Sequence, residues 1–265
     1  MVLFDYSREP RSDIAFVDMK SFYASCECIA LGLDPLKTSL CVMSRIENSA
    51  GLILAATPLF KKNFGSQNVS RSYNLPFDAH TRKFNYTAAR KQGLPITADY
   101  VRFIEDAAQK TLLVPPRMNY YIQKNMEIQK IFQDFAAPDD IFPYSIDEGF
   151  LDLTSSINYF IPDQTLDRRT KLDLLAARIQ QAIWKKTGIY ASIGLSNANP
   201  LLAKLALDIE AKHTKKMRVN WSYEDVPSKV WTIPTITDFW GIGHRTATRL
   251  KKLGIHSIYD LAHFN

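Results

Sequence analysis

Apolar and polar positions along the chain follow two different periods, and this pattern predicts a mixed α+β protein. Short apolar runs bounded by turn residues indicate buried strands, whereas apolar residues three or four positions apart indicate amphipathic helices. Strands are expected at Ile14–Asp18, Ser39–Met43, Gly51–Ala56, Thr111–Val114, Asp139–Ser145, Phe150–Thr154 and Tyr190–Leu195. Helices are expected at Ser21–Leu31, Pro58–Phe64, Met118–Phe135, Leu166–Lys186 and Pro200–Lys212, with a separate helical segment over Trp221–Asn265.

In chain order, these elements contain a β-α-β-β-α-β series with a large insertion after its first strand. The simplest packing of such a series is a ferredoxin-like sheet with helices on one face. In that topology the first strand, Ile14–Asp18, is a close neighbour of the hairpin turn Ile146–Gly149, although the two are far apart in the sequence. Residues from both segments would then share one site.

Two acidic clusters end strand-like runs. Phe16–Tyr23 contains Asp18, and Tyr144–Asp152 contains Asp147 and Glu148. Each cluster has an ordinary alternative: a strand-terminal Asp often caps the next helix, and an Asp-Glu pair is common in a solvated turn. Buried together, however, three carboxylates would repel strongly, and a pair of divalent cations is the natural remedy. In combination, the clusters predict metal-assisted phosphoryl chemistry.

Composition narrows the class of protein. Hydrophobic residues make up 46% of the 265 positions, which is enough for a substantial core. The net charge of +6 suits a polyanionic partner, although many basic proteins share it. The three cysteines argue against a disulfide framework, no apolar run approaches the ~20 residues of a membrane span, and no signal-peptide pattern is present. We expect a soluble, cytoplasmic protein without a membrane partner.

Four motifs, in order, resemble those of the Y-family, or translesion, DNA polymerases. Asp18–Glu27 is most similar to UmuC-like proteins of the ImpB/MucB/SamB type, whose motif also runs Phe-Tyr-Ala-Ser-Cys-Glu. Ser145–Asp152 resembles the second acidic motif of the family, and Gly194–Ala206 resembles its third. Asp238–Ile255 resembles its helix-hairpin-helix thumb. The resemblance extends from about residue 13 to residue 265.

The resemblance implies a two-metal site. Asp18, Asp147 and Glu148 would be the catalytic carboxylates and would hold two Mg²⁺ ions, and the carbonyl of Met19 would complete a coordination shell. One ion lowers the pKa of the primer 3′-hydroxyl, and the other neutralises the triphosphate and the leaving pyrophosphate. Ligands that are all oxygen fit Mg²⁺ and disfavour zinc.

The resemblance also implies a nucleotide site after the first strand. Lys20, Ser21, Phe22 and Tyr23 would begin a helix whose free N–H groups suit a triphosphate. Tyr23 matches the steric-gate position of the family, where a bulky ring collides with a 2′-hydroxyl and so selects deoxynucleotides. An aromatic residue that packs the helix against the sheet is the alternative for Tyr23, and Phe22 is expected to be core or sugar-facing.

Other cations and the thumb complete the implied contacts. Lys204 and Lys62 match family positions that contact the incoming phosphates, and a solvated helix charge is the alternative for both. The thumb residues expected to grip a DNA phosphate without reading sequence are Gly241, Ile242, Gly243 and Arg245. The basic run Lys212–Arg218 lies along duplex DNA in one interpretation and is a solvated linker in the other.

The predicted domains are a palm at residues 1–25 and 109–219, small fingers at 26–108 and a thumb at 220–265. A further DNA-gripping domain of relatives, the little finger, is missing at the end of this sequence, as in a truncated or short form. Because that domain supplies phosphate contacts, we expect primer extension to be weak, distributive and sensitive to salt. Extension that stayed high when the salt concentration was raised fourfold would contradict this expectation.

The resulting prediction is the core of a template-directed DNA polymerase that adds dNTPs opposite damaged template, in DNA repair and the SOS response. Its implied partners are primer-template DNA and dNTP, with a sliding clamp, a recombinase filament and a regulatory subunit as further candidates by resemblance. Two alternatives stay open: a nucleotide cyclase, whose hairpin would read Gly-Gly-Asp-Glu-Phe where this chain has Ser145-Ile146 before its Asp-Glu, and a non-catalytic DNA-binding scaffold.

Overall fold

A computed structural model describes residues 5–44, 51–65 and 70–264, and it divides the chain into two compact units. The five-stranded unit contains the residues up to Asp18, Gln129–Lys185 and the residues from Tyr190 onward. The three-stranded unit contains Met19–Ile128 and Lys186–Ile189. Most of the connection between the two strands expected at Ser39–Met43 and Gly51–Ala56 lies outside the described residues.

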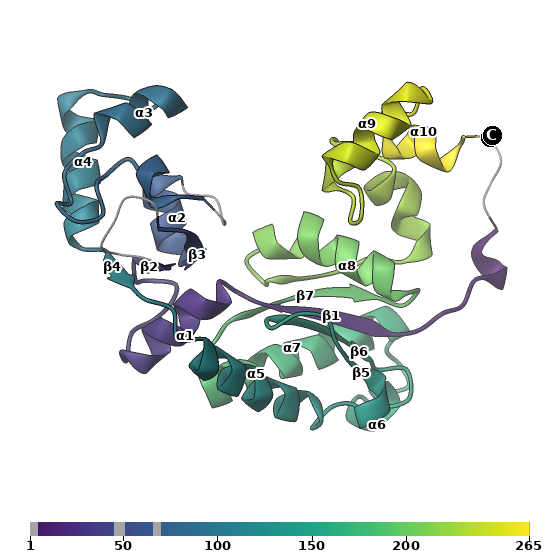
Figure 1. Ribbon diagram of the computed structural model, residues 1–265. Helices are drawn as coiled ribbons and strands as arrows, with labels where there is room; N and C mark the ends of the chain where they lie inside the picture. The colour runs from purple at the N-terminus through teal and green to yellow at the C-terminus, as the bar shows by residue number, and fades with distance from the viewer. Residues whose placement is uncertain (1–4, 45–50, 66–69, 265) are drawn as a thin grey trace. The chain divides into compact units, whose positions relative to one another are not determined.

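The five-stranded unit has the predicted β-α-β-β-α-β order and one further strand (Figure 1). Its strands are β1 (Ile14–Met19), β5 (Ile141–Pro143), β6 (Glu148–Asp152), β7 (Ala191–Ser196) and β8 (Arg218–Asn220). Its α-helices are the end of α5 (Met118–Phe132), α6 (Ile157–Phe160), α7 (Arg168–Thr187) and α8 (Pro200–Ile209). The sheet order is β5-β6-β1-β7-β8, with β6 antiparallel to both β1 and β5, and β8 parallel to β7. The short strand β8 begins at Arg218, the last residue of the basic run, and was not predicted.

The sheet is covered on both faces, so the expectation of helices on one face is wrong. Ile14 and Phe16 of β1 pack against Ala203 and Leu207 of α8. Figure 1 shows α7 on the opposite side of the sheet from α8. The reason is that the chain continues past β7 into α8, whose apolar residues cover the face that a single helical layer would leave open to water.

Gly194 in β7 lets α8 lie directly on the sheet. A Cβ atom at this position would lie 2.0 Å from the carbonyl oxygen of Ala203 and 2.4 Å from the backbone nitrogen of Leu207. Both atoms belong to the helix backbone, so a rotamer change cannot relieve the clash. The separation of α8 from β7 is therefore set by the absence of a side chain at Gly194.

The C-terminal segment is helical, as predicted, and packs on α8 within the same unit. Its elements are the 3₁₀-helices η5 (Tyr223–Asp225) and η7 (Ile236–Asp238), the π-helix η6 (Val226–Val230), and the α-helices α9 (His244–Lys252) and α10 (Ile258–Ala262). Trp221, Val230 and Ile258 share a buried cluster with Leu202 and Ala206 of α8. Burial of these apolar side chains joins the segment to the sheet.

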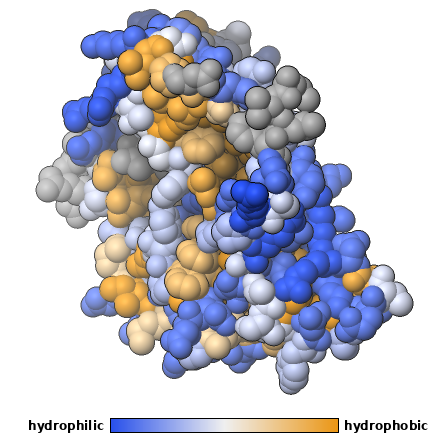
Figure 2. All heavy atoms as spheres, turned by 90° about the vertical axis from the view of Figure 1, so that its right-hand side faces the viewer, coloured by the Kyte–Doolittle hydropathy of each residue, from blue (hydrophilic) through white to orange (hydrophobic). Residues whose placement is uncertain are grey.

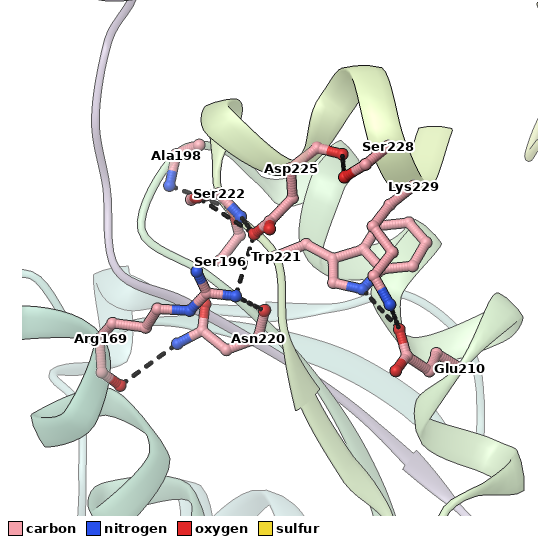
Figure 3. A network of polar contacts seen from close by, with 10 residues as sticks. All are labelled: Arg169, Ser196, Ala198, Glu210, Asn220, Trp221, Ser222, Asp225, Ser228 and Lys229. Carbon is pink, nitrogen blue, oxygen red and sulfur yellow. Dashed lines mark hydrogen bonds and ion pairs between the residues drawn. The ribbon is translucent and has the colours of Figure 1, made fainter. Parts of the chain in front are cut away.

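A polar network supports the same junction (Figure 3). Glu210, just after α8, accepts hydrogen bonds from the indole nitrogen of Trp221 at 2.9 Å and from the ammonium group of Lys229 at 2.9 Å. Arg169 of α7 donates to the carbonyl of Asn220 and to the carboxylate of Asp225. The C-terminal helices are thus tied to α7 and to the end of α8.

The three-stranded unit combines a small sheet with four complete α-helices and the first part of a fifth. Its strands are β2 (Leu40–Met43), β3 (Ile53–Ala56) and β4 (Leu112–Val114), in the order β3-β2-β4. Its helices are α1 (Phe22–Ala30), α2 (Pro58–Phe64), α3 (Tyr86–Gln92), α4 (Ala98–Gln109) and the first part of α5.

Short 3₁₀-helices occur in both units of the described chain. They are η1 (Tyr6–Arg8), η2 (Ser72–Asn74), η3 (Pro138–Asp140) and η4 (Ala211–His213), besides η5 and η7.

Helices α3 and α4 were not predicted, although the sequence carries their start signals. The side chain of Asn85 accepts a hydrogen bond from the backbone nitrogen of Ala88, and that of Thr97 accepts one from Tyr100. Both are N-cap residues. Helix α3 lies in a polar stretch of the sequence, whereas α4 follows it, and Ala89 of α3 shares a buried cluster with Ile104 and Ala108 of α4.

The surface carries both polar and apolar areas. On the face drawn in Figure 2, wide hydrophilic areas alternate with smaller patches of exposed hydrophobic residues. The exposed large hydrophobic residues of the C-terminal segment include Leu253, Tyr259 and Phe264. Among the residues described, every helix is too short or too polar to cross a bilayer.

Candidate active site

Two of the three predicted carboxylates meet at the centre of the five-stranded sheet. Asp18 lies near the end of β1, on the same face as Ile14 and Phe16, because side chains of a strand alternate. Glu148 begins β6 and is the register partner of Asp18. Directly opposed residues of an antiparallel pair project on one face as neighbours, so the two carboxylates lie side by side beneath α8.

Two lysines from α8 and the turn after it neutralise this pair. The ammonium nitrogen of Lys204 lies 2.8 Å from Oε1 of Glu148. That of Lys212 lies 3.1 Å from Oδ2 of Asp18 and 3.7 Å from Oε1 of Glu148. Asp208 binds both lysines, at 3.1 Å from Lys204 and 3.0 Å from Lys212. The three residues are four positions apart, which places them on one side of α8 and η4.

Asp147, the third predicted carboxylate, lies in the turn that leads into β6. The hydroxyl of Ser145 donates to Oδ1 of Asp147 at 2.8 Å and accepts from the backbone nitrogen of Glu148 at 3.1 Å. The backbone nitrogens of Tyr144 and Ser145 both donate to the carbonyl of Glu148. This tight turn bends the backbone at the two consecutive acidic residues, which is the condition for both to serve one site.

Burial perturbs the carboxylates strongly. Burial raises the pKa of Asp18 to about 7, and the neighbouring Glu148 adds to the shift while Lys212 opposes it. Burial also acts to raise the pKa of Glu148, but its hydrogen bonds with Asp18 and Lys204 outweigh it and lower the pKa. The pKa of Asp147 is raised, chiefly by burial and also by the charge of Glu148. The pKa values of the two central carboxyl groups are thus moved apart, with that of Asp18 raised and that of Glu148 lowered, as is expected of closely spaced carboxylates.

The donor chemistry of this cluster fits a divalent cation. Three acidic side chains, those of Asp18, Glu148 and Asp208, face two ammonium groups, so acidic groups are in excess. All the acidic ligands offer oxygen, which suits Mg²⁺. Among residues 5–44, 51–65 and 70–264, however, no three side chains of His, Cys, Asp or Glu are grouped so that they could hold a metal ion. Asp18 and Glu148 come together with lysines rather than with Asp147, so the three-ligand assignment stays a prediction.

Lys204 is a buried part of the site and not a solvated helix charge. It is 6% exposed, and its ammonium nitrogen lies 5.0 Å from the centroid of the Phe16 ring and 5.8 Å from that of Tyr144. Its closest partner is Glu148, so it acts here as an internal counterion. Contact between Lys204 and nucleotide phosphates stays a prediction.

Lys212 is the functional residue that the sequence interpretation missed. It was assigned to a basic run that is either a DNA contact or a linker, but its side chain is largely buried and binds Asp18 and Asp208. The carboxylates of Asp18 and Asp208 outweigh burial and raise the pKa of Lys212, so the ammonium stays charged. The spacing of Lys204, Asp208 and Lys212 was the available signal. Arg218 is likewise paired in the fold, with Asp173, so the solvated-linker interpretation is wrong for both ends of the run.

The predicted nucleotide residues that follow Asp18 belong to the three-stranded unit. Met19 is buried at the end of β1. Ser21 precedes α1 with a φ of 50°, in the left-handed region, and the hydroxyl of Ser25 donates to the carbonyl of Lys20 at 2.6 Å. A non-glycine residue in this conformation is stored strain of the kind found at functional sites. Lys62 lies on α2 with its side chain exposed.

The two aromatic residues at the start of α1 have different environments. Phe22 is 2% exposed, so it is a core residue. Tyr23 is partly exposed, and its ring stacks on that of Tyr121 with 4.4 Å between centroids and 13° between planes. Tyr23 is therefore accessible on one side and supported on the other, which is compatible with the predicted steric gate.

The predicted DNA-binding hairpin is exposed at the start of α9. Gly241 has a φ of 89°, which other residues rarely adopt, and Gly243 is the N-cap of α9. The backbone nitrogen of Ile242 donates to the carbonyl of Phe239 at 3.0 Å, and Arg245 follows on the exposed first turn of the helix. The hairpin thus presents the exposed backbone of Gly241 and Gly243 beside a cation, the chemistry that grips a phosphate.

The same overall fold occurs in solved structures. The insertion ternary complex of Dbh DNA polymerase matches with a TM-score of 0.66 and 24% identity over 96% of this chain and 61% of that chain. The fold is therefore that of the Y-family DNA polymerases.

Sequence comparisons narrow the assignment. The sequence model of the impB/mucB/samB family matches residues 81–208, and that of the IMS family HHH motif matches residues 223–255. The putative UV-damage repair protein UvrX of Bacillus subtilis is 34% identical over 99% of this chain and 52% of its own length. The DNA repair protein homolog YozK of the same organism is 33% identical over 54% of this chain and 98% of its own length.

The chain therefore belongs to the impB/mucB/samB family, the UmuC-like group of Y-family proteins. It spans about half the length of curated relatives such as UvrX. The first family match contains the turn of Asp147 and Glu148 and most of α8, whereas the strand of Asp18 is covered by the match to UvrX.

Proposed function

We propose that this chain is the catalytic core of a template-directed DNA polymerase of the translesion type. The observation that carries the proposal is the register pair of Asp18 and Glu148 at the centre of the sheet, with Asp147 preceding Glu148 in the turn. Family membership supports this proposal, as does the exposed hairpin Gly241–Gly243. The substrates would be primer-template DNA and dNTP, as in the ternary complex of the structural relative.

Asp18, Asp147 and Glu148 would hold the divalent cations that members of the Y family use, and two Mg²⁺ ions are the proposed complement. Bound there, the ions would activate the primer 3′-hydroxyl and neutralise the triphosphate. The chain's own lysines have a defined part in this site. A cation held by Asp18 and Glu148 would compete with Lys212 for the same oxygens, and Lys204, which is bound to Glu148 inside the fold, is the proposed contact to the incoming phosphates.

The remaining roles follow the domain assignment of palm (1–25 and 109–219), fingers (26–108) and thumb (220–265). Tyr23 would act as the steric gate, with Lys20, Ser21 and Lys62 toward the triphosphate and Arg245 toward the DNA backbone. Recruitment by a sliding clamp, a recombinase filament or a regulatory subunit is proposed only because the chain resembles the family. We propose a cytoplasmic location, where the chain would meet its DNA substrate.

Primer extension with a single dNTP tests the proposal. The wild-type chain should add the templated nucleotide in the presence of Mg²⁺. Asp147→Ala, and the isosteric variants Asp18→Asn and Glu148→Gln, should reduce the rate by at least about a hundredfold. Asp163→Asn, which removes an exposed carboxylate outside the site, should extend normally.

Other outcomes would contradict the proposal in recognisable ways. Cyclic dinucleotide made without template would identify a nucleotide cyclase. DNA binding without turnover in the wild-type chain and in all variants would identify a non-catalytic scaffold. In the extending enzyme, Tyr23→Ala should raise ribonucleotide incorporation, and an unchanged preference would withdraw the gate assignment.

A further inference from the structure

A buried acid joins the helix that carries Tyr23 to α5. Glu27 lies four residues after Tyr23 on α1, so the two side chains share one face of the helix. Glu27 is only 4% exposed, and a buried carboxylate is costly unless it is paired. All the residues that pair with it belong to the three-stranded unit.

Arg117 and Tyr121, also four positions apart, supply the partners. The guanidinium of Arg117 donates to both carboxylate oxygens of Glu27, with its Nη2 at 2.7 Å from Oε2 and its Nε at 3.0 Å from Oε1. The hydroxyl of Tyr121 donates to Oε1 at 2.7 Å. Charge-assisted bonds of this two-pronged kind are strong and fix geometry. Glu27 is therefore held at both oxygens, and it in turn fixes the hydroxyl of Tyr121.

The ring of Tyr121 transmits this restraint to Tyr23. Tyr121 is fully buried, and its ring lies almost parallel to that of Tyr23 at a centroid separation of 4.4 Å. Since its hydroxyl is bonded and its ring is enclosed, Tyr121 is a rigid wall on one side of Tyr23. A steric gate excludes a 2′-hydroxyl only if its ring cannot move away from the collision.

We propose that Arg117, Glu27 and Tyr121 form a brace that holds Tyr23 in place and thereby sets the discrimination between deoxyribonucleotides and ribonucleotides. This inference rests on the proposed function, in which Tyr23 is the gate. Tyr121 and Glu27 are positioning residues, because they act on the sugar through Tyr23. The brace explains why a carboxylate is buried on α1 at a distance of one helical turn from the gate.

The test compares kcat/KM for a dNTP with that for the matching rNTP. Tyr121→Leu removes the stacked ring and should reduce the preference for dNTP about tenfold. Tyr121→Phe keeps the ring, loses only the bond to Glu27, and should reduce the preference about threefold. The change should come from more efficient use of the rNTP, with dNTP incorporation close to wild type.

Phe77→Leu is the matched stability control, because it also trims a fully buried aromatic of the same unit. It should lower Tm without changing the dNTP preference. A general loss of activity with both nucleotides in Tyr121→Leu would indicate a purely structural role and overturn the proposal. The double variant Tyr23→Ala with Tyr121→Leu should be no less selective than Tyr23→Ala alone, because Tyr121 acts through Tyr23.

The outcomes separate this inference from the proposed function. If Tyr23→Ala relaxes selectivity and Tyr121→Leu does not, the brace is wrong and the polymerase assignment stands. If the wild-type chain extends primers and Tyr23→Ala has no effect, the gate and the brace both fail. If the chain extends no primer, ¹⁹F NMR of 3-fluorotyrosine at position 23 decides. Tyr121→Leu should shift and sharpen that resonance, Phe77→Leu should not, and an unchanged resonance in Tyr121→Leu would overturn the brace.

Discussion

At the scale of single residues, the geometry of the site depends on Gly194, a residue without a side chain. Gly194 brings the backbone of α8 against β7, and α8 with the turn after it carries Lys204, Asp208 and Lys212 to the carboxylates. Asp18 and Glu148 are placed by strand register alone, which is rigid. The positions of the lysines depend on the distance between α8 and the sheet, and the single methyl group of an alanine at position 194 would change that distance.

Gly194→Ala should therefore destabilise the chain by about 3 kcal/mol, because the new Cβ meets helix backbone and α8 must move. Urea unfolding measures the loss. Gly243→Ala is the matched control: a Cβ there meets nothing within 4 Å, and the loss of a glycine N-cap should cost less than about 1 kcal/mol. Equal losses in the two variants would contradict the account of the α8–β7 contact.

At the scale of elements, the C-terminal helices are held to the sheet by an apolar cluster and by Glu210. Trp221 contributes to both, since its ring is buried in the cluster and its indole nitrogen donates to Glu210. The ammonium of Lys229, on η6, donates to the same carboxylate oxygen. One carboxylate thus anchors two different parts of the C-terminal segment.

The pH dependence of stability should reveal this anchor. Burial acts to raise the pKa of Glu210, but the bonds from Lys229 and Trp221 outweigh it and lower the pKa below the ordinary 4.5. A carboxylate with a lowered folded-state pKa contributes stability that is present above its unfolded pKa and is lost as the pH falls through its folded pKa. Glu210→Gln should therefore lower Tm at about pH 7 and make little difference at about pH 3.

Thermal unfolding of both chains at the two pH values checks this. Glu9→Gln, which removes an exposed carboxylate near the N-terminus, is the control and should change Tm little at either pH. A Tm difference for Glu210→Gln that is as large at about pH 3 as at about pH 7 would show that the carboxylate charge is not what anchors the helices.

At the scale of the whole molecule, the net charge of +6 and the cations of α9 make phosphate contacts the expected basis of DNA binding. Each phosphate neutralised by a cation releases a counterion, so the logarithm of the binding constant falls linearly with the logarithm of the salt concentration. Binding and primer extension should both weaken steeply when the salt concentration is raised fourfold.

Arg245→Gln should reduce the slope of this salt dependence by about 1, since it removes one phosphate contact. Fluorescence anisotropy with a labelled primer-template, over a series of salt concentrations, measures the slope. Lys185→Gln removes the same charge from an exposed position near the end of α7 and should leave the slope nearly unchanged. Identical slopes for both variants would show that Arg245 contributes only to the net charge.

The sequence by itself determined most of the strands and helices and the acidic residues of the predicted site, although α3, α4 and β8 were not predicted. Helix α2 has the predicted bounds of Pro58–Phe64, and the βαββαβ order follows from apolar runs whose period differs between strand and helix. The motifs placed Asp18, Asp147 and Glu148 in one predicted site. The structure brings Asp18 and Glu148 together, because the alternation of apolar residues and the turn residues determine how the two strands pair.

Only the tertiary structure decided which cations meet those acids and what lies behind Tyr23. Lys212 reaches Asp18 from a turn after α8, and Tyr121 reaches Tyr23 through the packing of α5 on α1, so each contact joins residues that are far apart in the sequence. The physical reason is that a charge or a ring in a helix looks the same in sequence whether it faces water or a buried partner. The partner of such a group is decided when elements that are far apart in the sequence pack together, because burial without a partner costs free energy.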